Sequence, residues 1–251
     1  MKKLIWKNVW QTLAAVVFLI GVWIVAYFHV GNELLVPSFR DSLKECAALF
    51  AKAAFWEGLL HTLDRTLFAF LISVLFGLIF AIVAYLYPSF SNFFTPIVSA
   101  LRSMPVMAVL LILLSIGGVA NAPVMVAFMS LFPMLYTGIF AGVSSVDKHL
   151  IAVSRVQGTP LLRRVTAIYL PLSSPYILRE AGGALSFSLK LVVSAEILAL
   201  TASSLGGMLY DARTFSNVPQ LFALVAVIFL LGLLLEMTFA MFAAAMEKKI
   251  K

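Results

Sequence analysis

The stretch SMPVMAVLLILLSIGGVANAPVMVAFMSLFPMLYTGIFAGVSSV, residues 103–146, contains no Asp, Glu, Lys or Arg. A helix needs about 20 apolar residues to cross the hydrocarbon core of a bilayer, so this stretch is too long for one crossing. Gly117, Gly118, Asn121 and Pro123 lie near its middle and are typical of a turn. The stretch therefore predicts two membrane-spanning helices, over residues 96–116 and 123–143.

The composition of the whole chain supports a membrane protein. Hydrophobic residues make up 63% of the 251 residues, charged residues only 12%, and the mean hydropathy is +1.05. A soluble domain of this size needs far more charge to cover its surface. Residues 9–28 are too long for the apolar part of a signal peptide and no Ala-x-Ala site follows them, so they predict a retained span. The fold class is therefore all-α and polytopic with about six crossings, the others over residues 66–87, 181–200 and 219–242.

The basic residues are unevenly distributed. The formal net charge is +7, and positive side chains gather before the first span, after the last span and within residues 145–178. Positive residues in alternate loops follow the positive-inside rule of membrane proteins. We therefore expect both termini and residues 145–178 in the cytoplasm of a bacterium, on a chain embedded in the lipid of the inner membrane, and no nucleic-acid partner. The terminal basic residues are Lys2, Lys3, Lys7, Lys248, Lys249 and Lys251.

The sequence gives no signal of a redox site, a zinc site or a nucleotide-binding phosphate loop. Cys46 is the single cysteine, and His29, His61 and His149 are scattered without metal-ligand spacing. The chain also has no Gly-x4-Gly-Lys-Ser/Thr phosphate loop. We expect no catalytic residue, no metal and no cofactor on the chain itself.

Residues 31–58 mix charged and apolar side chains. Leu43, Ala47, Phe50 and Ala54 recur at helical spacing, which predicts an amphipathic helix at the outer membrane surface. This pattern divides the chain into three parts. They are an N-terminal helix with its external connector, residues 1–56, a core of five spans, residues 57–243, and a basic cytoplasmic tail, residues 244–251.

Residues 145–178 interrupt the apolar pattern with two short predicted helices. The first, over residues 147–157, places Leu150, Val153 and Ser154 on one side and Arg155 elsewhere, and Gly158 is suited to end it. Thr159-Pro160 is typical of a helix start, and Leu170-Pro171 predicts a new break. The second helix has an apolar stripe of Leu161, Val165 and Ile168. From the residues alone, the segment is either a docking surface or an interfacial loop.

The spacing from Gly158 to Ile168 and then to Leu170-Pro171 resembles the cytoplasmic coupling loop of ABC importer membrane subunits. The following Pro175-Tyr176-Ile177 is similar to the nitrate/sulfonate/taurine-type branch of that family. Further similar stretches occur in the right order over nearly the whole chain. They are LLVPS at 34–38, PIVSALRSMPVMAVL at 96–110, FPMLYTGIFAGVSSVD at 132–147 and SLKLVVSAEIL at 188–198.

The resemblance implies a type I ABC importer permease fold with a cytoplasmic coupling helix. It also implies three protein partners: a cytoplasmic ABC ATPase that binds the ATP, an external substrate-binding protein, and a second permease subunit, either identical or closely related. The chain departs from the family at Ala152-Val153-Ser154, where the pattern has Glu-Ala-Ala. The residues that the resemblance assigns to ATPase coupling, within 147–171, are Leu150, Val153, Ser154, Arg155, Gly158, Leu161, Ile168, Leu170 and Pro171.

Four residues within or next to predicted spans are candidates for the translocation pathway. Lys190 and Glu196 lie inside the fifth span, where each charge costs about 2.5–3.5 kcal/mol at the centre of an isolated helix. We favour a place along the pathway over pairing with a neighbouring helix, for which Arg102 is the candidate partner of Glu196. Pro105 predicts a kink or a free carbonyl, and Arg102 equally suits the cytoplasmic interface.

Two alternatives from other functional classes stay open at this point. An ion-coupled secondary transporter would use Lys190 and Glu196 as a relay and need no ATPase. A membrane scaffold would use residues 147–171 only to recruit a partner. The prediction is the translocation subunit of an ABC importer, which is not itself an enzyme and moves a small solute delivered by the binding protein.

Overall fold

The computed structural model describes the backbone of residues 2–250 and the side chains of residues 14 and 16–246. The terminal lysines used in the charge argument lie outside these side-chain ranges. The described chain is helical and contains no strand, which confirms the all-α class. The elements are α1 (Lys2–Val30), α2 (Phe39–Phe50), α3 (Ala53–Leu86), α4 (Pro88–Ser103), α5 (Val106–Ser144), α6 (Lys148–Val156), α7 (Leu161–Arg164), the π-helix η1 (Val165–Tyr169), α8 (Leu170–Ala199), α9 (Leu205–Thr214) and α10 (Val218–Ile250).

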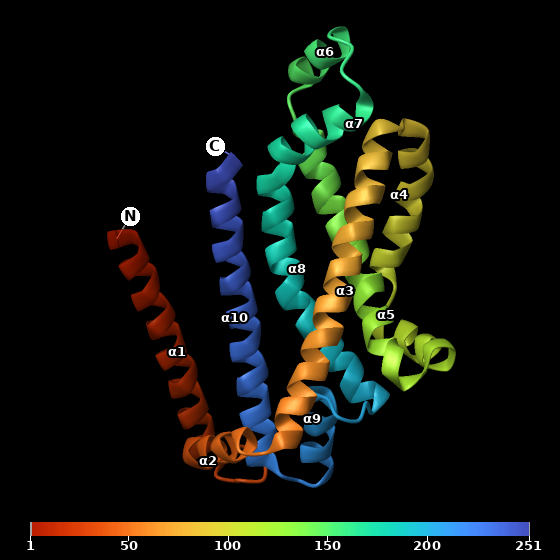
Figure 1. The fold of residues 1–251 in the computed structure, drawn as a ribbon. Coiled ribbons are helices and arrows are strands. Elements are labelled where there is room, and N and C mark those ends of the chain that lie inside the picture. Colours follow the sequence, from red (N-terminus) through yellow and green to blue (C-terminus); the bar gives the residue numbers. More distant parts are fainter. Residues whose placement is uncertain (1, 251) are drawn as a thin grey trace.

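The long helices run side by side, α4 (Pro88–Ser103) runs beside α3, and the other short helices lie at the two ends of the bundle (Figure 1). One end, called here the α6 end, holds α6, α7, the start of α1 and the last turns of α10. The opposite end, called the α9 end, holds α2 and α9. The arrangement places α6 and α9 on opposite sides of any membrane that the long helices cross.

Four helices of the described chain are long and apolar enough to cross a membrane, and α1 adds a shorter apolar segment, Val16–Val30. The four are Ala53–Leu86, Val106–Ser144, Leu161–Ala199 and Val218–Met246. Length and apolar composition thus reproduce most of the predicted spans, because a helix satisfies its own backbone groups in lipid.

The predicted span over residues 96–116 is wrong as a single helix. The chain leaves α4 at Ser103, Met104 and Pro105 are extended, and α5 starts at Val106. The turn predicted after Gly117 is confirmed, because Gly118 has φ 69° and ψ 176° and divides α5 into two arms. Leu110 on the first arm and Val126 on the second belong to one buried cluster, so the two arms pack together.

The core lies where α3, α5 and α8 meet. Gly77 lets α3 approach α5, because a Cβ there would lie 3.2 Å from Leu135 Cβ. The Ser188 hydroxyl of α8 donates to the Thr66 carbonyl of α3 at 3.0 Å, and Ser186 donates to the Gly232 carbonyl of α10 at 2.9 Å. Small residues that bring backbones together are typical of membrane helix packing.

The amphipathic helix expected near residues 43–54 is present as α2, but its buried side differs from the predicted one. Leu49 and Ser42 are buried, whereas Leu43 and Phe50 of the predicted stripe are 59% and 45% exposed. The reason is that α2 packs against α10 through the neighbouring face. The predicted stripe is left on the outside.

Candidate functional site

Residues 147–171, called here the elbow, form two short helices at the α6 end (Figure 1). Asp147 caps the first, since its Oδ1 accepts the His149 N–H at 2.8 Å. At the other end of α6 the Thr159 N–H donates to the Ser154 carbonyl and the Gly158 N–H donates to the Arg155 carbonyl, both at 3.0 Å. This is a Schellman cap with Gly158 at φ 69°, as predicted for a glycine that ends a helix. The bend is therefore built into the backbone.

The α6 helix buries one side and exposes an apolar surface on the other. Ile151 and Ser154 are 6% and 5% exposed, and the Ser154 hydroxyl donates to the Ile151 carbonyl. Leu150, Val153 and Val156 are 50%, 54% and 90% exposed. The sequence predicted Leu150, Val153 and Ser154 on one common surface. This is wrong for Ser154, which packs toward the body of the protein.

The second half of the elbow differs from the prediction in two respects. Thr159-Pro160 predicts a start with Thr159 at the N-cap, whereas Pro160 occupies the N-cap position of α7 and Leu161 is its first residue. The predicted break at Leu170-Pro171 is absent, because Leu161–Ala199 is one continuous helix. The π-helix at residues 165–169 widens the turn before Pro171, which has no N–H to donate and would clash within a regular α-helix.

The remaining elbow candidates are partly packed. Ile168 contacts the main core, Leu170 and Pro171 are half-buried, and Leu161 is 40% exposed. The exposed charges of the elbow are mostly basic, including Lys148, Arg155 and Arg163. Its carboxylate, Asp147, caps α6, and Ala152, at the position of the family's Glu, is exposed.

At the α9 end, Glu196 is fully buried and engaged on every side. Its carboxylate accepts from Arg65 Nη1 at 2.8 Å, from the Thr62 hydroxyl at 2.9 Å and from the Gly206 N–H at 3.2 Å. The predicted partner Arg102 is wrong, since Arg102 is exposed at the end of α4. The carboxylate does not face open space.

The same network caps α9. The Leu205 N–H donates to Thr62 Oγ1 at 3.0 Å, the Gly206 N–H to Glu196, and the Gly207 N–H to Ser204 Oγ at 2.9 Å. The first amides of a helix have no partner within it and favour negative charge. The buried carboxylate therefore joins α3, α8 and the start of α9, and Gly206 makes the close approach possible because a Cβ there would lie 2.4 Å from Glu196 Cβ.

The other pathway candidates lie elsewhere. Lys190 is exposed on the face of α8 that does not carry Glu196. Pro105 precedes α5 instead of kinking a helix, and its carbonyl accepts from Ala108 and Val109, so it is not free. The four candidates do not meet at one site.

One face of α8 stays exposed along its length although this helix is the most buried of the four long ones. The face carries two cations, Arg179 and Lys190, and its period of three to four residues follows the helix turn. Arg179 was missed by sequence reasoning, and its spacing of eleven residues from Lys190, three helical turns, was the available signal. The exposed residues are Leu172, Tyr176, Arg179, Gly183, Phe187, Lys190, Ser194 and Leu198.

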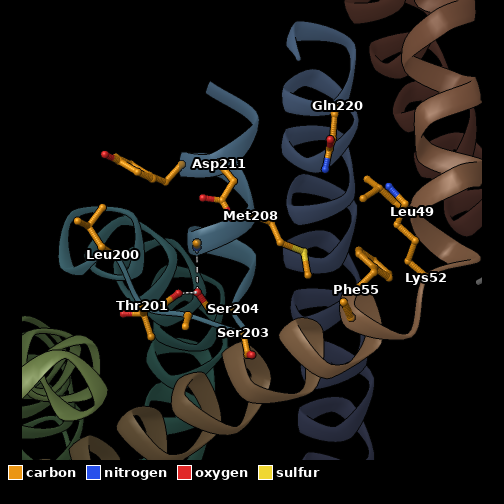
Figure 2. A pocket seen from close by; sticks show the side chains of 14 residues that line it. Leu49, Lys52, Phe55, Leu200, Thr201, Ser203, Ser204, Met208, Asp211 and Gln220 are labelled. Atoms are coloured by element: carbon orange, nitrogen blue, oxygen red, sulfur yellow. Dashed lines mark hydrogen bonds between the residues drawn. The ribbon is translucent and has the colours of Figure 1, made fainter. Parts of the chain in front are cut away.

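A pocket of about 490 Å³ opens at the α9 end beside the capped helix (Figure 2). Lys52 and Gln220 lie on one side of it, and Leu200 and Asp211 lie across from them. Leu200 and Ser203 have φ of 53° and 47°, so the loop before α9 holds two non-glycine residues in the left-handed region. The pocket is lined by both polar residues, such as Lys52 and Asp211, and apolar residues, such as Phe55 and Met208.

Comparison with known proteins identifies the family. Residues 73–251 match the model of the "Binding-protein-dependent transport system inner membrane component" family. The taurine transport system permease protein TauC of Escherichia coli K12 is 26% identical over 221 residues, covering 86% of this chain and 80% of TauC. The putative aliphatic sulfonates transport permease protein SsuC of Bacillus subtilis 168 is 24% identical over 234 residues, covering 92% of this chain and 83% of SsuC.

Solved structures show the same fold. An amino acid ABC transporter chain superposes with a TM-score of 0.64 at 19% identity, covering 81% of this chain and 97% of that chain. A chain of the inward-facing MetNI methionine ABC transporter gives 0.61 at 20% identity, covering 76% and 93%. The protein belongs to the family of binding-protein-dependent transport system inner membrane components and is a membrane-spanning permease subunit of an ABC importer.

Proposed function

We propose that the elbow is the surface through which this permease subunit binds a cytoplasmic ABC ATPase. The observation that carries the proposal is the exposed apolar row of Leu150, Val153 and Val156 on a helix whose opposite side is buried. A water-exposed apolar row on a rigid helix is typical of a protein contact. The second half of the elbow, from Leu161 onward, is continuous with α8, so a displacement of α6 that is passed on across Gly158 would reach a central helix of the bundle.

This docking would put the α6 end, with the start of α1 and the last turns of α10, in the cytoplasm and the α9 end outside. The basic residues of the elbow support this orientation. The external binding protein would then release its solute at the α9 end, where the pocket of Figure 2 opens. ATP would be bound by the ATPase, in keeping with the lack of a phosphate loop in this chain.

A second permease subunit would cover the exposed face of α8. Arg179 and Lys190 lie on this face within a membrane-spanning helix, and charged side chains at such depth usually face a bundle interior or a water-filled cavity. Two copies facing each other through α8 would enclose a path with positive side chains. We expect the solute to carry an anionic group, a property of the taurine and sulfonates named for two relatives.

The ion-coupled alternative has no support from the relatives, which are permease subunits of binding-protein-dependent systems. Its proposed relay also lacks a path, because Glu196 is buried with Arg65 and Thr62 while Lys190 lies on another face. The structure offers no continuous relay between the two residues.

Co-expression with a candidate ABC ATPase partner tests the docking surface. Val153→Asp puts a charge into the exposed apolar row without entering the core, and Gly158→Pro removes the left-handed residue of the cap. Both variants are expected to lose co-purification of the ATPase and solute uptake. Asn92→Asp, at an exposed position near the same end, is the control. Retention of the ATPase and of uptake by Val153→Asp would refute the docking proposal.

A further inference from the structure

A hollow of about 440 Å³ lies between the elbow and the end of α3. It is distinct from the exposed apolar row of α6, and its volume is within the range of about 300–1,000 Å³ typical of ligand pockets. Two arginines line it and no carboxylate does. The lining residues are Leu86, Tyr87, Arg155, Gly158, Thr159, Leu161 and Arg164.

Neither arginine forms an ion pair with a carboxylate of the described residues. Asp147, the carboxylate of the elbow, already accepts the His149 N–H at the start of α6. Two guanidinium groups beside a hollow whose lining residues include no carboxylate favour an anion that brings oxygen acceptors.

The depth of the hollow indicates where that anion comes from. Leu86 ends a charge-free stretch that begins at Thr66, and this stretch has about the length that crosses a hydrocarbon core. Tyr87 follows it, as aromatic residues do at membrane interfaces. The hollow therefore lies at the level of lipid headgroups, with Leu86 and Leu161 as apolar lining beside the arginines.

We propose that this hollow binds the phosphate group of an anionic phospholipid, with the Arg155 and Arg164 guanidinium groups donating to the phosphate oxygens. Basic pockets at the cytoplasmic ends of membrane helices bind such headgroups. The bound lipid would contact α3 through Leu86 and Tyr87 and the elbow on both sides of Gly158. It would thereby hold the elbow at a set position relative to the bundle.

Native mass spectrometry of the full chain, extracted from membranes containing phosphatidylglycerol and phosphatidylcholine, tests the proposal. The wild type is expected to retain phosphatidylglycerol in preference to phosphatidylcholine. A gain of about fivefold in affinity per arginine near an anionic lipid predicts a loss of about 30-fold in Arg155→Gln/Arg164→Gln. Arg163→Gln removes the same charge from an exposed position outside the hollow and is expected to keep the lipid.

Each other outcome overturns the proposal. Equal loss in Arg163→Gln and Arg155→Gln would mean unspecific attraction to the surface. Displacement of the lipid by soluble glycerol phosphate at matched concentration would assign the hollow to a soluble anion. Loss of ATPase binding with unchanged lipid retention would assign the arginines to a carboxylate of the ATPase. Unchanged helical content by circular dichroism in Arg155→Gln/Arg164→Gln keeps these outcomes separate from misfolding.

Discussion

Replacing Glu196 by alanine should destabilise the protein strongly, because the carboxylate holds three elements together. In the variant, Arg65, whose side chain is 17% exposed, loses its partner across 2.8 Å, and the Gly206 N–H and the Thr62 hydroxyl lose an acceptor. Breaking a buried ion pair by removing one partner costs about 3–5 kcal/mol. The lost amide and hydroxyl contacts belong to the same network, so their contributions are contained in this range rather than added to it.

The isosteric change Glu196→Gln should cost less. An amide keeps one oxygen acceptor but loses the charge that Arg65 pairs with, and a hydrogen bond to a charged group contributes about 1.5–3 kcal/mol. Glu196→Ala/Arg65→Ala removes both charges and should therefore be more stable than the sum of the two single changes predicts. Lys190→Ala, on the exposed face of the same helix, is the control and should stay within about 0.5 kcal/mol of wild type.

The measurement is reversible unfolding in mixed micelles, read by far-ultraviolet circular dichroism, with hydrogen exchange of the Leu205 and Gly206 amides as the local readout. These amides donate to Thr62 and Glu196, so they should exchange faster in Glu196→Ala while the core of α5 stays protected. A free energy of unfolding within about 0.5 kcal/mol of the wild type is a roughly twofold change in the unfolding equilibrium constant. That result for Glu196→Ala would refute the claim that the Glu196 carboxylate holds three elements together. Additive effects in the double variant would refute the ion pair as its basis.

Further predictions concern packing, topology and transport. Gly206→Ala should destabilise by about 1–3 kcal/mol, because its Cβ would lie 2.8 Å from the backbone nitrogen of Ile197, whereas Gly183→Ala meets no atom within 4 Å and should be neutral or stabilising by thermal unfolding. Cys46 should react with a membrane-impermeant maleimide that is added outside intact cells. The reaction should be slow at neutral pH, because burial raises the pKa of the Cys46 thiol, and should become faster as the pH rises and the thiolate forms. Labelling of Cys46 only after the membrane is permeabilised would reverse the proposed orientation. If Lys190 binds an anionic group of the solute, Lys190→Gln should lower solute uptake by about tenfold, chiefly by raising the apparent KM. Unchanged uptake would show that Lys190 does not contact the solute.

The sequence predicted those features of the fold that depend only on residues close together in the chain. Charge-free length predicts helices that cross a membrane, since a helix satisfies its backbone groups without water. Gly158 and Gly118 were expected at the bends, and both have φ of 69°. The elbow was found from the spacing between Gly158 and the Leu170-Pro171 pair. Which of its side chains contact the ATPase remains a prediction to be tested.

Tertiary packing decided the features that no local pattern contains. Glu196 meets Arg65 across 131 residues of sequence, and the pairing depends on how two helices are rotated against each other. The same is true of the exposed α8 face with Arg179, which became visible only once the buried side of the helix was known. Helix propensity and charge pattern act within a few helical turns, so they determine where helices form and how the chain is oriented in the membrane. Contacts between helices that are distant in sequence determine which side chains are buried, paired or left facing a path.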